Sequence, residues 1–243
     1  MWTLPKSADL APRPGSHAAR IGGGRDDSGA AAVEFAIVLP VLMLLLFGML
    51  EYSLVMRDSS GVSATVRVGV RVAASGAGAG DGVCPNPLPD PSYVCAPARY
   101  SPALVTSAIN AMQQAGTGLT ADQVNYVLVY KANLNGWPGT ATDASTAAAQ
   151  CAVISNNCVK FTYNKVADKY QYASGSWDSA TINACINATL GQSVGVYLNA
   201  SRPFMYRVLG TTTTMDDNAV MKFEPLPIQS CNGSGSSSSG GHS

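Results

Sequence analysis

The sequence is poor in histidine, with only two such residues. His17 lies near the N-terminus and His242 lies in the Gly/Ser-rich C-terminal tail, so neither falls within a segment that is expected to fold. Serine or cysteine nucleophiles commonly depend on an imidazole base. No metal-ligand set and no paired-carboxylate motif stands in for the missing histidine. We therefore expect a protein that is not an enzyme and that carries no cofactor.

Charge is also scarce. Charged residues make up 12% of the chain, and 15 basic residues balance 15 acidic ones. A neutral chain gives no reason to expect nucleic acid as a partner, because such proteins carry basic patches. Apolar residues make up 47%, a balance that favours an envelope or extracellular protein over a charged cytosolic one.

No cysteine precedes the one long apolar run of the chain. All six follow it, and an even number confined to one side of such a run favours disulfides in an oxidising compartment. The first two bracket a Pro-rich segment, the middle two flank a short loop, and the last is a candidate partner for the fifth. Sequence alone leaves fifteen pairings open among Cys84, Cys95, Cys151, Cys158, Cys185 and Cys231.

The apolar run predicts a transmembrane helix. Residues 35–50 are sixteen uncharged positions, which span roughly 24 Å of a bilayer core that is ~30 Å thick. With its flanks the segment is long enough, but these include Glu34 and Glu51. Glu51 is expected at the interface. Glu34 is the anomaly, because a carboxylate inside a membrane costs a few kcal/mol unless it is paired.

Charges on either side suggest the orientation. Basic residues favour the cytoplasmic side, and they precede the run at Lys6, Arg13, Arg20 and Arg25. Arginines that follow the run weaken this contrast, but disulfides require the C-terminal part to be exported. We expect a single-pass protein of the cell membrane with a cytoplasmic N-terminus and an extracytoplasmic C-terminal domain.

A processing motif precedes the run. Gly29 is followed by Ala30, and Glu34 falls at the fifth position from Ala30, directly before Phe35. This pattern resembles the class III leader of type IV prepilins. The resemblance implies cleavage after Gly29 by a prepilin peptidase, and assembly in which Glu34 pairs with the new amino group of a neighbouring subunit. Alternatively, Glu34 is an interfacial carboxylate of an uncut anchor.

Two longer stretches resemble the TadE-like family of tight-adherence (Flp-type) pilus systems. Residues 28–76 carry the motif above, the Leu-rich run, Glu51-Tyr52 and a small-residue helix, and residues 191–225 resemble that family's distal pair of strands. The resemblance implies a minor pilin-like component of a pilus assembly system, whose partners are the membrane, other pilin-like subunits and assembly proteins. The alternative is a membrane-anchored extracellular binding module that does not enter a filament.

The expected fold is α+β and pilin-like: a long N-terminal transmembrane helix, then an exported domain with a small antiparallel sheet and one or two packed helices. Valines at positions 62, 66 and 70 give the later part of the helix one apolar face. The predicted organisation is a leader (1–29), the transmembrane and stalk helix (30–75), a Gly-rich linker (76–83), the α+β domain (84–231) and a disordered tail (232–243).

Within the domain, residues 104–112 predict a helix that Ser101 caps and Gly116 ends. Residues 133–149 are turn-rich, and 178–190 predict a short helix. Asp216-Asp217-Asn218 is expected in a solvated turn, and Trp137 and Trp177 are expected to cover the edge of a core. Strands are predicted at residues 124–131, 159–164, 192–200 and 211–223.

Overall fold

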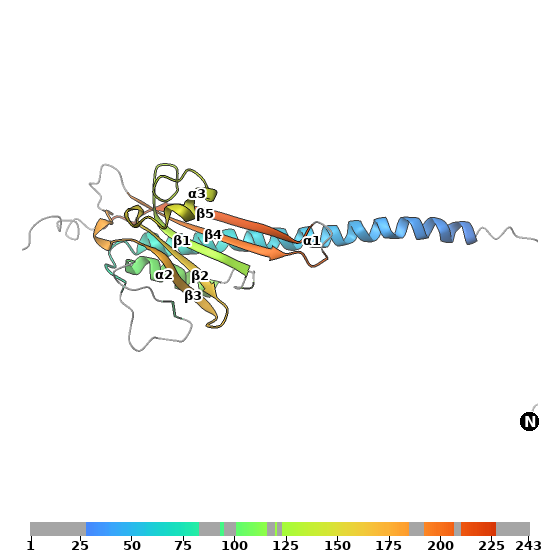
Figure 1. Cartoon of the computed structure of the whole chain (residues 1–243), viewed down its shortest axis with the longest axis horizontal. Coiled ribbons are helices and arrows are strands. Elements are labelled where there is room, and N and C mark those ends of the chain that lie inside the picture. The colour runs from blue at the N-terminus through green and yellow to red at the C-terminus, as the bar shows by residue number, and fades with distance from the viewer. Residues whose placement is uncertain are drawn as a thin grey trace, which may run out of the picture. The chain divides into compact units, whose positions relative to one another are not determined.

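The computed structural model describes residues 28–82, 93–94, 101–115, 120, 123–184, 192–206 and 210–226. Its chain divides into two compact units, residues 1–43 and 44–243. The predicted α+β fold is confirmed, because a long N-terminal helix is followed by one antiparallel sheet and further helices (Figure 1).

Helix α1 runs without interruption over Ser28–Ser75 and contains Pro40. In the first unit its described side chains lie at the surface, and only Leu39 is even partly covered. From residue 51 onward the pattern changes, and buried positions alternate with exposed ones. One helix thus has a largely exposed apolar segment, followed by an amphipathic segment that packs against the rest of the second unit.

The second unit is built on a five-stranded antiparallel sheet. The strands lie in the order β3-β2-β1-β4-β5, and every neighbouring pair is antiparallel. Four strands fall where the sequence predicts them, and β3 was not predicted because its Gly and Ser residues resemble a turn. The strands are β1 (Val124–Ala132), β2 (Cys158–Asn164), β3 (Lys169–Ser176), β4 (Ser193–Pro203) and β5 (Thr212–Lys222).

The acidic triplet of β5 corrects one expectation. Asp216, Asp217 and Asn218 lie inside the strand and pair with residues 197–199 of β4, rather than forming a turn. Asp and Asn disfavour strands intrinsically, but pairing along the whole length of a neighbouring strand overrides that preference.

Helix α2 (Ala103–Ala115) confirms the strongest helix prediction of the domain. The predicted Ser101 cap is wrong, because the helix begins at Ala103 and the buried Ser101 hydroxyl has no hydrogen-bond partner within the described part of the chain. The backbone of Ser101 is instead occupied, since its carbonyl accepts a hydrogen bond from Gly82 at 3.1 Å.

Two shorter helical segments also differ from prediction. Residues expected to be turn-rich contain α3 (Ala144–Gln150), whose N-terminus is capped by Asp143. Hydrogen bonds from Ser145 and Thr146 lower the pKa of the Asp143 carboxyl. The helix expected over 178–190 is a single 3-10 turn, η4 (Ser179–Thr181), where the structure describes it, and residues 185–190 lie outside the described residues. A further 3-10 turn, η3 (Ile154–Asn156), precedes β2.

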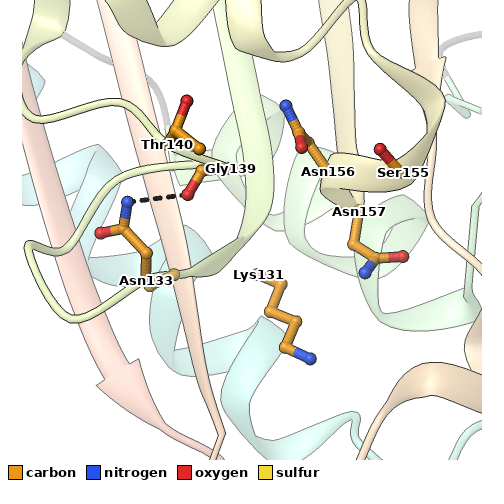
Figure 2. Close-up of a pocket in the computed structure, with 8 residues that line it drawn as sticks. Lys131, Asn133, Gly139, Thr140, Ser155, Asn156 and Asn157 are labelled. Carbon is orange, nitrogen blue, oxygen red and sulfur yellow. Dashed lines mark hydrogen bonds between the residues drawn. The ribbon is translucent and has the colours of Figure 1, made fainter.

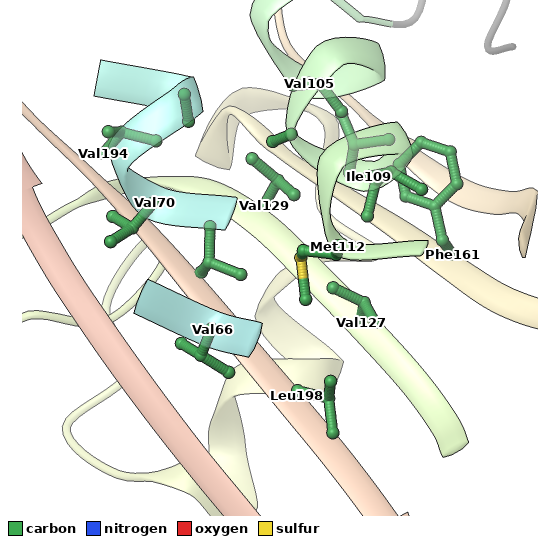
Figure 3. Close-up of a cluster of buried hydrophobic side chains, with 14 of the residues drawn as sticks. Val66, Val70, Val105, Ile109, Met112, Val127, Val129, Phe161, Val194 and Leu198 are labelled. Carbon is green, nitrogen blue, oxygen red and sulfur yellow. The ribbon is translucent and has the colours of Figure 1, made fainter. Parts of the chain in front are cut away.

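The main core lies between the sheet and two helices. Valines of α1, including Val66 and Val70, meet Val105, Ile109 and Met112 of α2 and the inward residues of β1, β2 and β4 (Figure 3). This confirms the apolar face expected of α1. Gly69 permits the contact between the helices, because a Cβ there would come within 2.5 Å of the Met112 sulfur.

The opposite face of the sheet carries a second, smaller cluster. Tyr130 of β1 and Tyr197 of β4 pack there with Leu128, Ala147 of α3 and the cysteines. Because β1 is covered on both faces, its sequence reads as a continuous apolar run rather than an alternating one. Burial raises the pKa of the Tyr130 and Tyr197 hydroxyls, so both stay neutral near pH 7.

The segment expected as a linker is held to the rest of the second unit. Ala103 donates a backbone hydrogen bond to the Gly80 carbonyl at 2.9 Å, and Gly82 donates one to the Ser101 carbonyl at 3.1 Å. Trp177 is buried against Phe223, whereas Trp137 is half-buried against the Tyr197 ring. Both tryptophans therefore pack on core residues, as expected.

A pair of helix valines tests how far the fold depends on packing between α1 and the sheet. Val66 is fully buried, whereas Val68 is 38% exposed. We expect Val66→Ala to lower the free energy of unfolding of the detergent-solubilised chain by about 2 kcal/mol, from lost burial and an incompletely filled cavity. Val68→Ala, with the same gain in helix propensity, should change it by less than about 0.5 kcal/mol. Equal effects in denaturant titrations would contradict this packing.

Candidate functional site

The first candidate site is the exposed apolar surface of α1. The helix is long and apolar enough to cross a membrane. Apart from the half-buried Leu39 and Phe47, its large apolar side chains from Val33 to Leu50 are 42–68% exposed. Such a surface in water exceeds what a soluble monomer normally shows. The most exposed members are Val33, Phe35, Ile37, Val41 and Met49.

The predicted processing and assembly residues all lie on this segment. Gly29 is exposed, and Ala30 lies in the first turns of the helix. Glu34 is exposed next to Phe35, which is 64% exposed. Within the part of the chain that the structure describes, the Glu34 carboxylate makes no hydrogen bond and no ion pair. A lone carboxylate on an apolar helix therefore lacks an internal partner there.

The other two acidic residues of α1 are buried in the second unit. Glu51 is 2% exposed, and its Oε1 accepts a hydrogen bond from the backbone N–H of Tyr206 at 3.3 Å. Its Oε2 has no partner among the described residues. The Tyr206 ring stacks on Phe47, with ring centroids 4.7 Å apart. The start of the β4–β5 loop therefore lies directly over Glu51.

Two turns further along α1, Asp58 forms an ion pair with Arg202 of β4. The side chains are only 7% and 15% exposed, respectively. Residues seven apart lie on one face of a helix, so Glu51 and Asp58 both face the β4–β5 hairpin. We call Glu51, Asp58, Arg202 and Tyr206 the helix–hairpin clamp.

Sequence reasoning missed this clamp. The available signal was the spacing of Glu51 and Asp58 within an otherwise apolar helix, because carboxylates that share an apolar face need partners. The partners lie more than 140 residues away, and nothing local in the sequence identifies them.

A polar cleft lies at the end of β1 (Figure 2). Its volume is about 290 Å³, and no carboxylate lies among its lining residues. Two of its amides are already used: the Asn133 Nδ2 donates to the Gly139 carbonyl at 3.0 Å, and the Asn156 Nδ2 donates to the Gln150 carbonyl at 2.9 Å. The cleft offers one cation, Lys131, and its amides mainly hold the surrounding loops together.

A disulfide borders this region. Cys151 and Cys158 are bonded, with Cα atoms 4.9 Å apart, and both are fully buried. The bridge closes the loop that the sequence suggested for this pair and fixes the position of η3 beside the cleft. Cys84, Cys95, Cys185 and Cys231 lie outside the described residues.

Most of α1 matches a known protein family. The family model described as TadE-like protein matches residues 29–71, so this segment of the chain is TadE-like, as the resemblance in the sequence indicated. The matched segment holds Gly29, Glu34, Glu51 and Asp58, and ends within the amphipathic part of α1. The resemblance noted at 191–225 lies beyond it and stays a prediction.

No curated protein and no solved structure matches the chain.

Removal of the disulfide should weaken the second unit. Cross-linking residues seven apart stabilises a fold by about 2–3 kcal/mol through restriction of the unfolded chain. We expect the double variant Cys151→Ser, Cys158→Ser to lose about this much in denaturant titrations, and Ala152→Ser, an exposed change in the same loop, to lose almost nothing. Alkylation of Cys151 or Cys158 in the unreduced parent chain would show that the bond is absent.

Breaking the ion pair of the clamp should cost more than an exposed charge does. Removal of one member leaves the other buried and uncompensated, so Asp58→Ala and Arg202→Ala should each lower the free energy of unfolding by about 3 kcal/mol. The double variant should recover at least about 1 kcal/mol of the summed loss. Arg67→Ala, at an exposed site on the same helix, serves as the control. Strict additivity would mean that the two side chains do not interact.

Proposed function

We propose that this protein is a minor pilin-like component of a tight-adherence pilus assembly system, anchored in the membrane by α1 and without catalytic activity. The observation that carries the proposal is the composition of α1, a TadE-like helix with one exposed carboxylate on an otherwise apolar first half. The amphipathic second half belongs to the folded domain.

The apolar half supports a role in anchoring. Its exposed side chains are Val, Ile, Leu, Phe and Met over several consecutive turns, which gives no polar face to water. An interfacial helix would need such a face. A bilayer, or the helices of neighbouring subunits, would cover this surface on all sides.

Glu34 supports assembly rather than anchoring alone. A carboxylate at this depth costs a few kcal/mol in a bilayer, and the chain would be a better anchor without it. A charged partner from a neighbouring subunit offsets that cost and fixes the relative position of the two helices. Cleavage after Gly29 would create such a partner, the amino group of Ala30.

The exported domain supports a specific contact role. The sheet and α2 pack against the second half of α1 in one continuous core. Because the helix is part of that core, a force applied to the domain would be transmitted to the helix. A membrane-anchored binding module that never enters a filament shares this architecture. It differs in needing neither the cut after Gly29 nor the charge of Glu34.

The two roles can be separated in cells that produce the pilus. If the chain is a processed subunit, mass spectrometry should find a mature N-terminus at Ala30, and Glu34→Gln should abolish its recovery with sheared filaments. Glu224→Gln, which removes an exposed carboxylate of the domain, should leave recovery unchanged. An intact leader together with normal behaviour of Glu34→Gln would favour the binding module.

A further inference from the structure

The start of the β4–β5 loop lies beside the end of the apolar run. We call Phe204, Met205 and Tyr206 the loop tip; these residues follow β4 directly. Tyr206 contacts α1 twice, through its ring on Phe47 and through its N–H to the Glu51 carboxylate. The loop tip is thus fixed at a known position along the helix.

That position can be related to the thickness of a bilayer. Residues 30–50 are 21 positions, which span about 31 Å as a helix and match a hydrocarbon core of ~30 Å. If Ala30 marks one boundary, Leu50 marks the other. Phe47 then lies about 4.5 Å inside the boundary, and a loop stacked on Phe47 reaches the same level.

The surface at this level has the chemistry of a membrane interface. Met205 is 69% exposed and Tyr206 is 43% exposed, and on α1 Met49 and Tyr52 are 68% and 57% exposed. Tyrosine favours the boundary between hydrocarbon and headgroups, because its ring is apolar and its hydroxyl is polar.

Among the described residues, the two acidic side chains of α1 that lie nearest this surface do not project from it into solvent. Glu51 is covered by the loop tip, and Asp58 is paired with Arg202. An outward carboxylate at the level of Glu51 would be repelled by the hydrocarbon. The loop tip thus shields the one acidic residue that falls at the boundary.

From these contacts we propose that the loop tip is a second membrane-binding element, which inserts Met205 and Tyr206 into the outer interface of the bilayer beside α1. The occupant of this surface is lipid, because the surface continues the apolar run of the helix. The inference rests on the proposed membrane anchor. Together the two contacts would set the depth and tilt of the domain, which one helix alone leaves free.

Tryptophan fluorescence tests the insertion in the full-length chain. Met205→Trp is placed in phosphatidylcholine vesicles with and without brominated acyl chains, and the emission of the parent chain, which has its own tryptophans, is subtracted. Most of the added emission should be quenched. Tyr206→Trp, which keeps an aromatic ring on Phe47, should behave in the same way and guards against a local perturbation by the first variant.

Two reference variants make the outcomes distinct. Leu134→Trp occupies a site that is 99% exposed just beyond Ala132, which pairs with Ser193 at the far end of β4, roughly 33 Å of strand from the loop tip. Its added emission should not be quenched. Met49→Trp reports on α1 itself and should be quenched.

Quenching at 49 without quenching at 205 or 206 would overturn the loop-tip proposal while leaving the anchor intact. A lack of quenching at all three positions would overturn the anchor as well. Blue-shifted but unquenched emission at 205 that disappears on dilution into excess lipid would indicate a second copy of the chain as the occupant, and would also overturn the proposal.

Discussion

The packing of one half of α1 into the sheet is the constraint on which the rest of the structure depends. Val66, Val70 and their neighbours form one side of the main core. Without the helix, the apolar face of the sheet would lack these packing partners. The same helix continues, without interruption, into a segment whose apolar side chains are left exposed by the described part of the chain. Fold and anchor therefore share a single element.

The double role of α1 explains why a glycine, Gly69, lies where the helix contacts α2. Gly69 brings α1 close enough to α2 for Met112 to pack against its backbone, although glycine weakens a helix by about 1 kcal/mol. The close approach also leaves little freedom for α1 to rotate within the domain. From residue 44 onward, where α1 belongs to the second unit, the exposed face of the helix therefore has a fixed orientation relative to the sheet.

Some of this architecture could be predicted from the sequence because its signals are local. The apolar run, the four-residue valine repeat and the β-branched runs of β1 and β4 each report their own structure. Strand β3 was missed because Gly175 and two serines mark a turn, yet Gly175 is needed at a positive φ of 87° against the Cys158 carbonyl. Helix α3 was missed because its seven residues are too few to show a period.

The residues of the candidate site also fall into two groups, those that the sequence could predict and those that it could not. Glu34 stands out as a carboxylate at the start of an apolar run, Gly29 through the resemblance to a prepilin leader, and the Cys151–Cys158 loop through its short spacing. The partners of Glu51 and Asp58 could not, because they come from the β4–β5 hairpin and become neighbours only when the sheet is complete. Local patterns identify the residue that needs a partner, and only the fold identifies which residue supplies it.

The three acidic residues of α1 show how these constraints bear on function. Glu51 and Asp58 lie within reach of the hairpin, and the chain supplies the N–H of Tyr206 and the guanidinium of Arg202 to them. Glu34 lies seventeen positions before Glu51, about 25 Å along the helix, and has no partner among the described residues. The described fold gives two of the helix carboxylates a partner within the chain and leaves the third exposed on an apolar surface, so a partner for the third would come from another molecule. The proposed assembly role follows from that difference, because a neighbouring subunit is where such a partner would be found.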